Sequence, residues 1–501
     1  MKLLSPTISK LLRIRHSQIE EWIQHPIEAQ RQVLQDLVTH GQYTAFGRKY
    51  GFSSLFTVRK FKEAVPIQTY DEIKPYIEKT IEGEENMLWN TPTNWFAKSS
   101  GTTSDKSKFI PITKESLENC HFQAAKDVLT LYYNARPQSD LLTGKGLVIG
   151  GSHQLSSLND EVQLGDLSAV LLQNAPFYGQ LIRTPDLAIA LLDEWEQKIE
   201  SLAHSTIPEN VTSISGVPTW TLVLVKRILD ITGAKQLTDV WPNLEVYIHG
   251  GVSFTPYKQQ FQQLLGSQVQ YLEMYNASEG FFAAQDSPDA NGMLLFTNHG
   301  IFYEFMPMEE IDKPNPTTIG LQKVELHKNY ALVISTNGGL WRYLVGDTIQ
   351  FTSLQPYRII VSGRTKQFMN AFGEEVMVNN TDDAIAYAAA ECQVVIADYT
   401  AAPKYFSEQG KGGHEWIIEF EQAPANLAKF TELLDTKLQQ LNSDYEAKRY
   451  RSIALDIPTV HAAPAGTFHT WLRQKGKLGG QHKVPRLSNH RQYVEEILQL
   501  L

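Results

Sequence analysis

The stretch "LEVYIHGGVSFTPYKQQFQQLLGSQVQYLEMYN", residues 244–276, decides the fold class. Its two apolar runs, 244–251 and 269–276, end in small or polar residues, which is typical of buried strands. Between them, residues 255–266 place apolar side chains at helical spacing. Strand, helix and strand at this separation predict a βαβ crossover and therefore a parallel sheet.

The rest of the chain predicts two domains around this unit. The first hundred residues read mainly helical, with one apolar face that stops near Gly41. After residue 292, short apolar runs separated by turns indicate an antiparallel sheet or small barrel, with "GLQKVEL" among the expected strands. The pattern then restarts, and a helix is expected near 379–391. We therefore expect an α/β fold: a large N-terminal domain (1–363) with α/β sheets and a small antiparallel barrel, and a smaller, mobile α+β C-terminal domain (364–501).

Bulk composition excludes several classes of protein. A chain of 501 residues exceeds one hydrophobic core, and 42% hydrophobic residues are ordinary for a globular protein. The formal net charge of −10 argues against nucleic acid or an anionic membrane as partner. Two cysteines exclude a disulfide framework and a cysteine zinc site. No run approaches the roughly 20 apolar residues of a membrane-spanning helix, so a cytoplasmic protein is expected.

A polar run, "KSSGTTSDKSKFIPIT" at residues 98–113, has the chemistry of a phosphate-binding loop. Glycine admits close backbone approach, hydroxyls donate hydrogen bonds and lysine adds charge. The groups that supply these properties are Ser99, Ser100, Gly101, Thr102, Thr103 and Lys106. The run is not a Walker A loop, because that pattern requires glycine where Lys106 stands. A polar surface turn is the alternative.

Two later motifs add to this interpretation. "YNASEG" (275–280) closes a predicted strand, where Tyr275 can stack on a base and Glu279 can hold Mg²⁺. "YLVGDTIQF" (343–351) places Asp347 to accept hydrogen bonds from ribose hydroxyls. Taken singly, a buried tyrosine, a strand-end glutamate and a turn aspartate explain these residues equally well. The three motifs in this order are specific.

In this order, "SSGTTSDKSK", "YNASEG", "VGDT" and "GRTK" resemble the adenylate-forming superfamily of acyl-CoA synthetases, luciferases and adenylation domains. Within it, the chain looks most like the auxin-responsive Gretchen Hagen family of acyl-acid amido synthetases. "AFGRKYGF" near the N-terminus and "GGQHKVPRLSN" near the C-terminus support this likeness, which spans residues 29–495. One departure is Ser104, where most of the superfamily has glycine.

The resemblance implies an ATP- and Mg²⁺-dependent ligase. Such an enzyme adenylates a small carboxylic acid and conjugates the acyl group to an amino acid, forming an amide. The alternatives are an acyl-CoA ligase of the same superfamily and a nucleotide-binding sensor or scaffold without turnover. The acid, the amino acid and the oligomeric state stay open.

The resemblance also implies the site residues. Lys483 is expected to contact the α-phosphate and the acyl oxygen, Lys366 to be the hinge of the small domain, and Glu279 to bind the metal. The expected nucleotide-binding residues are Ser99, Ser100, Gly101, Thr102, Thr103, Lys106, Gly250, Gly251, Tyr275, Asn276, Ser278, Asp347 and Arg364.

Plainer interpretations accompany several of these residues. Gly250 and Gly251 can simply form a tight turn, and Arg364 can be a surface ion-pair residue. The basic tail that contains Lys483 can be a solvated end. Trp220 is expected to line an acyl pocket, with packing in the core as the alternative. The fourteen histidines include no HExxH motif, so a metallohydrolase has little support.

Overall fold

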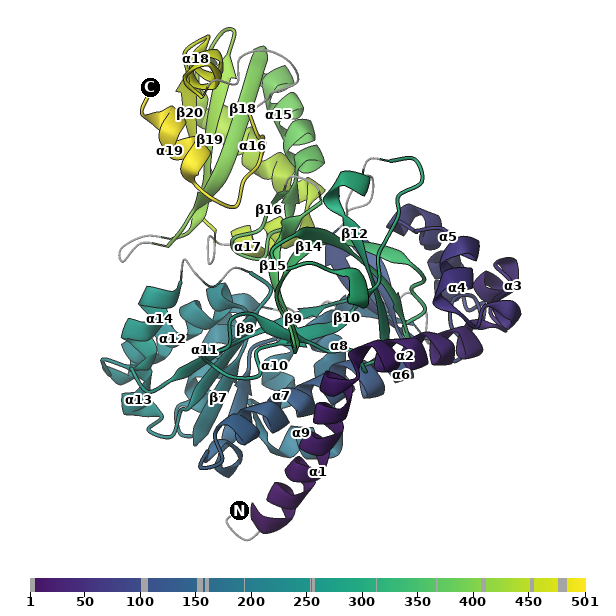
Figure 1. Ribbon diagram of the computed structural model, residues 1–501. Coiled ribbons are helices and arrows are strands. Elements are labelled where there is room, and N and C mark those ends of the chain that lie inside the picture. Colours follow the sequence, from purple (N-terminus) through teal and green to yellow (C-terminus); the bar gives the residue numbers. More distant parts are fainter. Residues whose placement is uncertain are drawn as a thin grey trace.

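The chain folds into a large N-terminal body and a smaller C-terminal body, as seen in a computed structural model (Figure 1). The structure describes residues 5–100, 107–150, 156–157, 162–192, 194–252, 254, 257–311, 313–365, 368–406, 411–450, 455–475 and 484–501. The mixed α/β class and the pairing of a large domain with a smaller one are confirmed.

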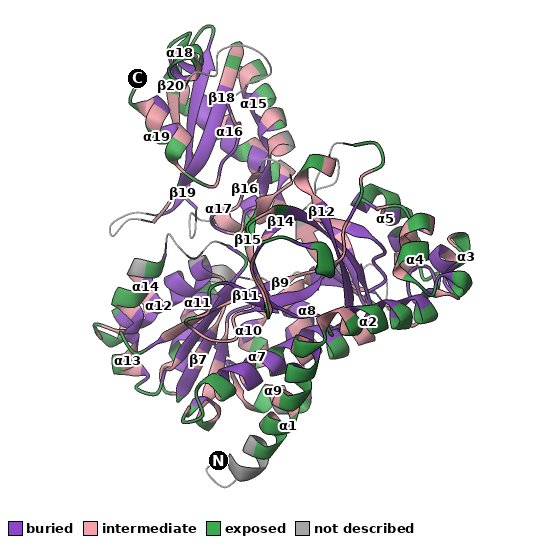
Figure 2. Cartoon of the chain, viewed as in Figure 1, coloured by how far each residue is buried: buried purple, intermediate pink, exposed green. Residues whose placement is uncertain are grey.

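The chain begins with helices that lie along one side of the large body. They are α1 (Ser5–Gln24), α2 (Pro26–Gly41), α3 (Ala45–Lys49), α4 (Val58–Ala64) and α5 (Tyr70–Ile81). As predicted, α2 ends at Gly41, and it buries one apolar face formed by Val33, Leu34, Leu37 and Val38. Figure 2 shows the opposite faces of α1 and α2 exposed.

The large body is built on an eleven-stranded sheet. In spatial order its strands are β12 (Ile301–Pro307), β13 (Asn329–Thr336), β14 (Tyr343–Leu354), β15 (Tyr357–Arg364), β11 (Met293–Leu295), β10 (Gly280–Ala284), β9 (Gln270–Ala277), β8 (Val246–Gly250), β7 (Val211–Ser215), β3 (Lys145–Val148) and β6 (Arg183–Thr184). The strands are largely buried (Figure 2), so this sheet carries the main core of the protein.

The predicted crossover is confirmed. The strands β8 and β9 pair in parallel from Val246 opposite Gln270 to Gly250 opposite Met274, and α14 (Lys258–Leu265) connects them. On its other edge, β9 pairs antiparallel with β10. The sheet therefore changes from parallel to antiparallel at β9, and the turn between β9 and β10 lies at the carboxyl ends of the parallel strands. Ligands of open α/β sheets bind at this edge.

The antiparallel strands belong to the same sheet. The expected small barrel is instead the curved end of the eleven-stranded sheet, with β12 at its edge (Figure 1). One expected strand is wrong, because "GLQKVEL" contains a short 3₁₀ turn at Leu321–Lys323. Its apolar residues anchor a connection: Leu321 and Val324 pack into the main core.

A second, four-stranded sheet carries residues 98–100 and 107–112 of the polar run. Its order is β2 (Ser107–Ile112), β1 (Trp95–Ser100), β5 (Gln163–Asp166) and β4 (Ser156–Ser157). The remaining helices of the large body are α6 (Lys114–Ser116), α7 (Phe122–Ala135), α8 (Leu167–Gln173), α9 (Phe177–Leu181), α10 (Leu187–Ala190), α11 (Trp195–Thr206), α12 (Pro218–Thr232) and α13 (Leu237–Val240).

The small body places helices against a three-stranded sheet of order β18–β19–β20. Its elements are β16 (Phe368–Met369), β17 (Val376–Met377), α15 (Val378–Cys392), β18 (Ile396–Lys404), β19 (Gly413–Phe420), α16 (Leu427–Leu441), α17 (Ser443–Arg449), β20 (Thr459–Ala463), α18 (Thr467–Gln474) and α19 (Gln492–Leu498). The division of the chain at residues 363 and 364 stays a prediction.

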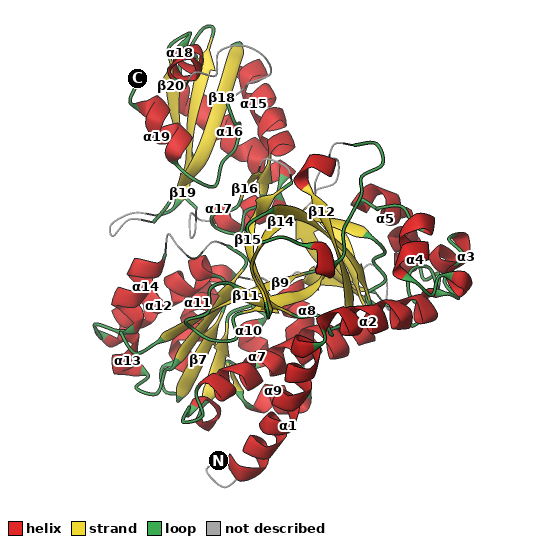
Figure 3. Cartoon of the chain, viewed as in Figure 1, coloured by secondary structure: helices red, strands yellow, loops and turns green. Residues whose placement is uncertain are grey.

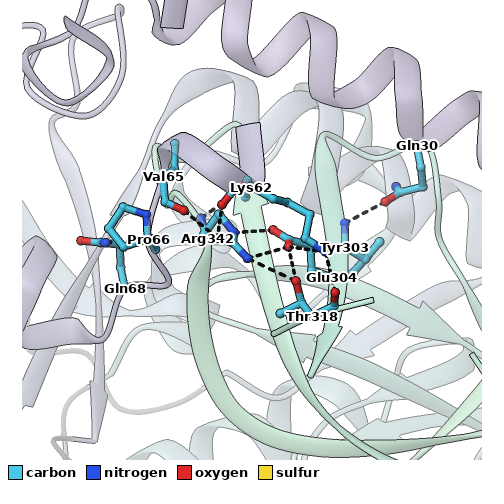
Figure 4. A network of polar contacts seen from close by, with 10 residues as sticks. Gln30, Lys62, Val65, Pro66, Gln68, Tyr303, Glu304, Thr318 and Arg342 are labelled. Atoms are coloured by element: carbon cyan, nitrogen blue, oxygen red, sulfur yellow. Dashed lines mark hydrogen bonds and ion pairs between the residues drawn. The ribbon is translucent and has the colours of Figure 1, made fainter. Parts of the chain in front are cut away.

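A buried polar network fixes the N-terminal helices to the sheet (Figure 4). Arg342, just before β14, donates to both carboxylate oxygens of Glu304 at 2.8 and 2.9 Å. It also donates to the carbonyl oxygen of Val65, just after α4, at 2.6 Å. Thr318 donates to Glu304 as well. Because every charge in this network is paired, the network can stay buried, and it holds β14 in place next to the candidate site.

Candidate nucleotide site

Three of the predicted site residues form one hydrogen-bonded chain. The Tyr275 hydroxyl, on β9, donates to Asp347 Oδ2 at 2.6 Å. The Arg364 Nε lies 2.8 Å from Asp347 Oδ1. A second guanidinium nitrogen of Arg364 donates to Glu375 Oε1 at 2.8 Å. The structure thus brings together side chains that are up to 100 positions apart in the sequence.

Strand register explains how Asp347 meets Arg364. The two residues are direct partners on the antiparallel strands β14 and β15. Burial works against the charge of Arg364, but the carboxylates of Glu375 and Asp347 outweigh it and raise the Arg364 pKa above its usual value. Arg364 is therefore an ion-pair residue, as the plainer interpretation expected, but the pair is not at the surface.

Lys108 is a basic residue of this site to which the sequence assigned no role. It lies on β2 with only 8% of its surface exposed. Its Nζ is 3.4 Å from the Tyr343 hydroxyl and 5.6 Å from the centre of the Tyr70 ring. Burial lowers the pKa of Lys108, while the charge of Glu279 opposes that shift. One signal was available: Lys108 alternates with Ile110 and Ile112 on a strand, so it falls on the face that those residues bury.

Most of the predicted phosphate loop lies outside the described residues. This applies to Gly101, Thr102, Thr103 and Lys106. The flanking strands are described, and Ser99 on β1 is the register partner of Lys108 on β2. The backbone of Ser100 is the last described position before the loop. The loop is therefore a connection between two antiparallel strands, one of which carries Lys108 to Tyr343.

Glu279 lies in the turn between β9 and β10, next to Ser278. Burial raises its pKa, and the nearby Lys108 and Arg364 oppose the shift. Among the described residues, no group of three or more His, Cys, Asp or Glu side chains is placed to hold a metal ion. Mg²⁺ commonly takes one or two carboxylates and completes its shell with phosphate oxygens and water. A single carboxylate at a nucleotide site therefore fits Mg²⁺.

Asn276 is held by a histidine that the sequence did not single out. The His121 Nδ1 lies 3.2 Å from Asn276 Oδ1. Burial lowers the pKa of His121 to about 4, so the ring is neutral near pH 7. His121 ends a π-helical turn, Leu117–His121, and such turns are frequent at functional sites. The packing of this helical turn against the sheet brings the two residues together, so no local pattern could predict the contact.

The two glycines at the end of β8 have separate structural reasons. A side chain at Gly250 would place its Cβ 2.3 Å from the Met274 carbonyl oxygen on β9. Gly251 adopts φ +82°, a conformation that favours glycine. The tight-turn interpretation therefore accounts for Gly251, and close strand packing accounts for Gly250. Contact with adenine stays a prediction for both residues.

The remaining predicted residues divide into two groups. Trp220, near the start of α12, is mostly buried among apolar side chains, as the core-packing interpretation expected. Lys448 of the small body reaches its ring, with Nζ 4.4 Å from the ring centre. Lys366 and Lys483 lie outside the described residues.

The assembled site combines both signs of charge within a small region. Lys108 and Arg364 supply cations, whereas Asp347, Glu279 and Glu375 supply carboxylates. Cations and a metal-binding carboxylate suit phosphates, and an anchored carboxylate suits the hydroxyls of a ribose. The arrangement is chemically suited to a nucleotide.

Comparison with family models covers most of the chain with three consecutive domains. Residues 15–270 match the GH3 family N-terminal domain, residues 294–364 the GH3 family central domain and residues 379–492 the GH3 family C-terminal domain. This chain belongs to the GH3 family. The resemblance to auxin-responsive amido synthetases noted from the motifs is confirmed.

Curated relatives of this GH3 chain are amido synthetases. Indole-3-acetic acid-amido synthetase GH3.3 of Arabidopsis thaliana is 22% identical, over 96% of this chain and 92% of its own. Jasmonoyl-L-amino acid synthetase JAR4 of Nicotiana attenuata is 24% identical, over 91% and 90%. The first is named for an amido synthetase of indole-3-acetic acid and the second for a synthetase of jasmonoyl-L-amino acids.

Solved structures share the GH3 fold. The GH3.15 acyl acid amido synthetase in complex with 2,4-DB has a TM-score of 0.63 and 16% identity, covering 97% of this chain and 96% of that one. A 2-hydroxyisobutyryl-CoA ligase has a TM-score of 0.57 and 14% identity, covering 95% and 92%. At these identities the likeness concerns the fold. Within the described part of the chain, no helix has the length and apolar character that crossing a bilayer requires.

Proposed function

We propose that this GH3 chain is an ATP- and Mg²⁺-dependent ligase that adenylates a small carboxylic acid and conjugates the acyl group to an amino acid. The observation that carries the proposal is the buried chain from Tyr275 through Asp347 to Arg364, with Glu279 and Lys108 beside it. The activity named for the homologues supports the same conclusion.

The chemistry proceeds in two displacements. An oxygen of the carboxylate attacks the α-phosphorus of ATP, and the bond to pyrophosphate breaks. The amine nitrogen of the acceptor then attacks the carbonyl carbon, the bond to AMP breaks and the amine loses a proton. Because both steps develop charge on oxygens, positioned cations and donors supply most of the catalysis.

The described residues take distinct roles in this scheme, and Tyr275 takes two. Asp347 accepts hydrogen bonds from the ribose, while Arg364 and Tyr275 keep its carboxylate in place. The ring of Tyr275 stacks on the base. Lys108 supplies charge near the phosphates from β2. Glu279 would hold Mg²⁺, which would supply neutralisation of charge on the phosphate oxygens.

The remaining predicted roles complete the proposal. The loop from Ser99 to Lys106 contacts the phosphates, Ser278 contacts a phosphate or the acyl group, and Asn276 contributes to nucleotide binding. Lys483 reaches the site when the small domain closes, with Lys366 as the pivot. Residues 1–363 would carry the nucleotide and acid sites and residues 364–501 the lid. The cytoplasmic location expected from the sequence stays a prediction.

The test is pyrophosphate release from Mg·ATP across a panel of carboxylic acids. Each acid is supplied alone, with mixed amino acids and with coenzyme A. We expect sustained turnover only with amino acids, and an amide product by mass spectrometry. Sustained turnover only with coenzyme A would replace the proposal with an acyl-CoA ligase. Failure to bind ATP at all would leave a protein without the proposed chemistry.

A further inference from the structure

Helix α17 presents two charged residues toward the large domain. Figure 1 places α17 beside β15 and β16, where the two bodies meet. Tyr445 is buried and donates to Asp435 Oδ1 at 2.6 Å, and Arg449 Nε pairs with the same carboxylate at 2.7 Å. These two contacts anchor the helix to the small domain. Asp444 and Lys448, four residues apart, share another face of the helix.

Lys448 reaches across the boundary between the domains. Its Nζ lies 4.4 Å from the centre of the Trp220 ring, which belongs to α12 of the large domain. A Cβ at Gly373, between β16 and β17, would lie 3.2 Å from Lys448 Cε, so the side chain is closely confined. Burial lowers the pKa of Lys448, and among the carboxylates that oppose this shift Asp444 has the largest effect. An ammonium group held over an indole face still has N–H donors that can bind an anion.

Carboxylates surround this cation on several elements. Asp444 interacts electrostatically with Glu375 and Asp166, and also with Lys98. Asp166 and Lys98 are register partners on β5 and β1, the strand that leads into the predicted phosphate loop. Glu375 binds Arg364, which binds Asp347. The charged face of α17 is therefore joined through Glu375 to the residues that we assign to the nucleotide.

We infer that α17 forms the acceptor site, in which Lys448 binds the carboxylate of the incoming amino acid and Asp444, with Glu375 and Asp166, faces its ammonium group. This inference rests on the proposed function. An amino acid is a zwitterion, and it requires a cation and a carboxylate a few ångströms apart. A pair four residues apart on one helix supplies that separation. Because α17 belongs to the small domain, the acceptor site is complete only when this helix lies against the large domain.

The test compares acceptors that differ in the carboxylate. The variants are Lys448→Met, which removes the cation, and Lys448→Arg, which retains it. The matched control is Lys437→Met on α16, whose Nζ lies 5.3 Å from the centre of the Tyr387 ring, which belongs to α15 of the small domain. Three acceptors are used: an amino acid that supports turnover in the panel described above, the amine that lacks the carboxylate of that amino acid, and hydroxylamine. Hydroxylamine captures the acyl-adenylate as a hydroxamate.

The quantity measured is kcat/KM for the amino acid divided by kcat/KM for hydroxylamine. We expect Lys448→Met to lower this ratio by about 10- to 100-fold, as loss of a charged hydrogen bond does. In Lys448→Met, the corresponding ratio for the carboxylate-free amine should change by less than about 2-fold. Lys437→Met should change the amino acid ratio by less than about 2-fold as well. Lys448→Arg should recover most of the loss, since it keeps the charge.

Other outcomes overturn the inference. Equal losses with the amino acid and hydroxylamine would show that Lys448 only holds the domains together. If the wild-type protein forms the amide and Lys448→Met leaves the ratio unchanged, the acceptor site alone is refuted. A wild-type protein that releases no pyrophosphate with any acid, or forms only thioesters, would instead contradict the proposed function and the acceptor site together.

Discussion

At the scale of the residue, the site depends on charges that are buried in matched sets. Asp347 is shared between the Tyr275 hydroxyl and the Arg364 guanidinium, at 2.6 and 2.8 Å. Burial, reinforced by the Asp347 charge, raises the pKa of Tyr275 well above its usual value, so its hydroxyl stays a donor. One carboxylate thus keeps both neighbours in fixed orientations.

This sharing predicts a graded response to substitution. Asp347→Asn removes the charge that pairs with Arg364, so we expect KM for ATP to rise by about 100-fold in pyrophosphate exchange. Tyr275→Phe keeps the ring and the ion pair and should raise KM by about 10-fold. Glu63→Gln, which alters an exposed carboxylate 3.7 Å from Arg59, is the control and should leave KM unchanged. Equal effects of Tyr275→Phe and Asp347→Asn would argue against Asp347 as the ribose ligand.

At the scale of the element, the end of β8 and the turn after β9 carry residues of the candidate site. The strands β8 and β9 approach closely because Gly250 has no side chain opposite the Met274 carbonyl. The turn that holds Ser278 and Glu279 begins just after β9, the strand that carries Met274. Strand packing at one position is therefore expected to control the position of Glu279, the carboxylate that we propose as the metal ligand.

A Gly250→Ala substitution tests this dependence. The added Cβ would lie 2.3 Å from the backbone oxygen of Met274, so β8 and β9 must separate. We expect a loss of about 2 kcal/mol in the free energy of unfolding by urea, together with loss of pyrophosphate exchange. The control is Gly179→Ala on α9, where no atom lies within 4 Å of the new Cβ. That change should be neutral or stabilising by up to about 1 kcal/mol. A stable, active Gly250→Ala protein would contradict the role given to strand packing.

At the scale of the whole molecule, the contacts between the two bodies in the described part of the chain include an apolar one and a charged one. Tyr257 of the large domain packs against Tyr405 and Phe406 of the small domain, with ring centres 5.9 and 6.2 Å apart. Its hydroxyl donates to the Ala371 carbonyl oxygen at 2.6 Å. The charged contact is the face of α17 with Asp444 and Lys448. Apolar packing favours the contact at all pH values, whereas the charged face makes it depend on pH.

Asp444 sets the direction of that dependence. Burial, with Glu375 and Asp166, raises its pKa to about 7 when α17 lies against the large domain, while Lys448 and Lys98 oppose the shift. An exposed aspartate titrates near 4. The contact between the domains favours the protonated form of Asp444. The stabilisation that this residue gives to the contact is therefore fully present below about pH 4 and is lost progressively until about pH 7.

Distances between spin labels on the two domains measure this effect. Labels at Tyr43→Cys and Val395→Cys use exposed positions, one on each body, in a protein with Cys392→Ser. From about pH 5 to about pH 7, the ratio of closed to open molecules should fall by about 10-fold or more. Asp444→Asn should abolish the change. If the ratio rose with pH, the ionised Asp444 would instead be holding the domains together.

Local sequence was sufficient for several features because they depend on local chemistry. The crossover at 244–276 follows from apolar spacing, and α2 ends at Gly41 as its pattern predicts. The curved sheet in place of a separate barrel was not predictable, because the pairing of β11 with β15 joins strands more than 60 residues apart. The 3₁₀ turn at Leu321–Lys323 resembles a strand in apolar content alone.

The sequence by itself determined the parallel crossover, the order of the nucleotide motifs and, through that order, the family. Each of these is written in neighbouring residues. Only the tertiary structure decided that Lys108 interacts electrostatically with Glu279, that His121 holds Asn276 and that α17 brings Lys448 to Trp220. The physical reason is that strand register and domain packing set these contacts. Both arise from many weak interactions across the whole core, and no short stretch of sequence contains them.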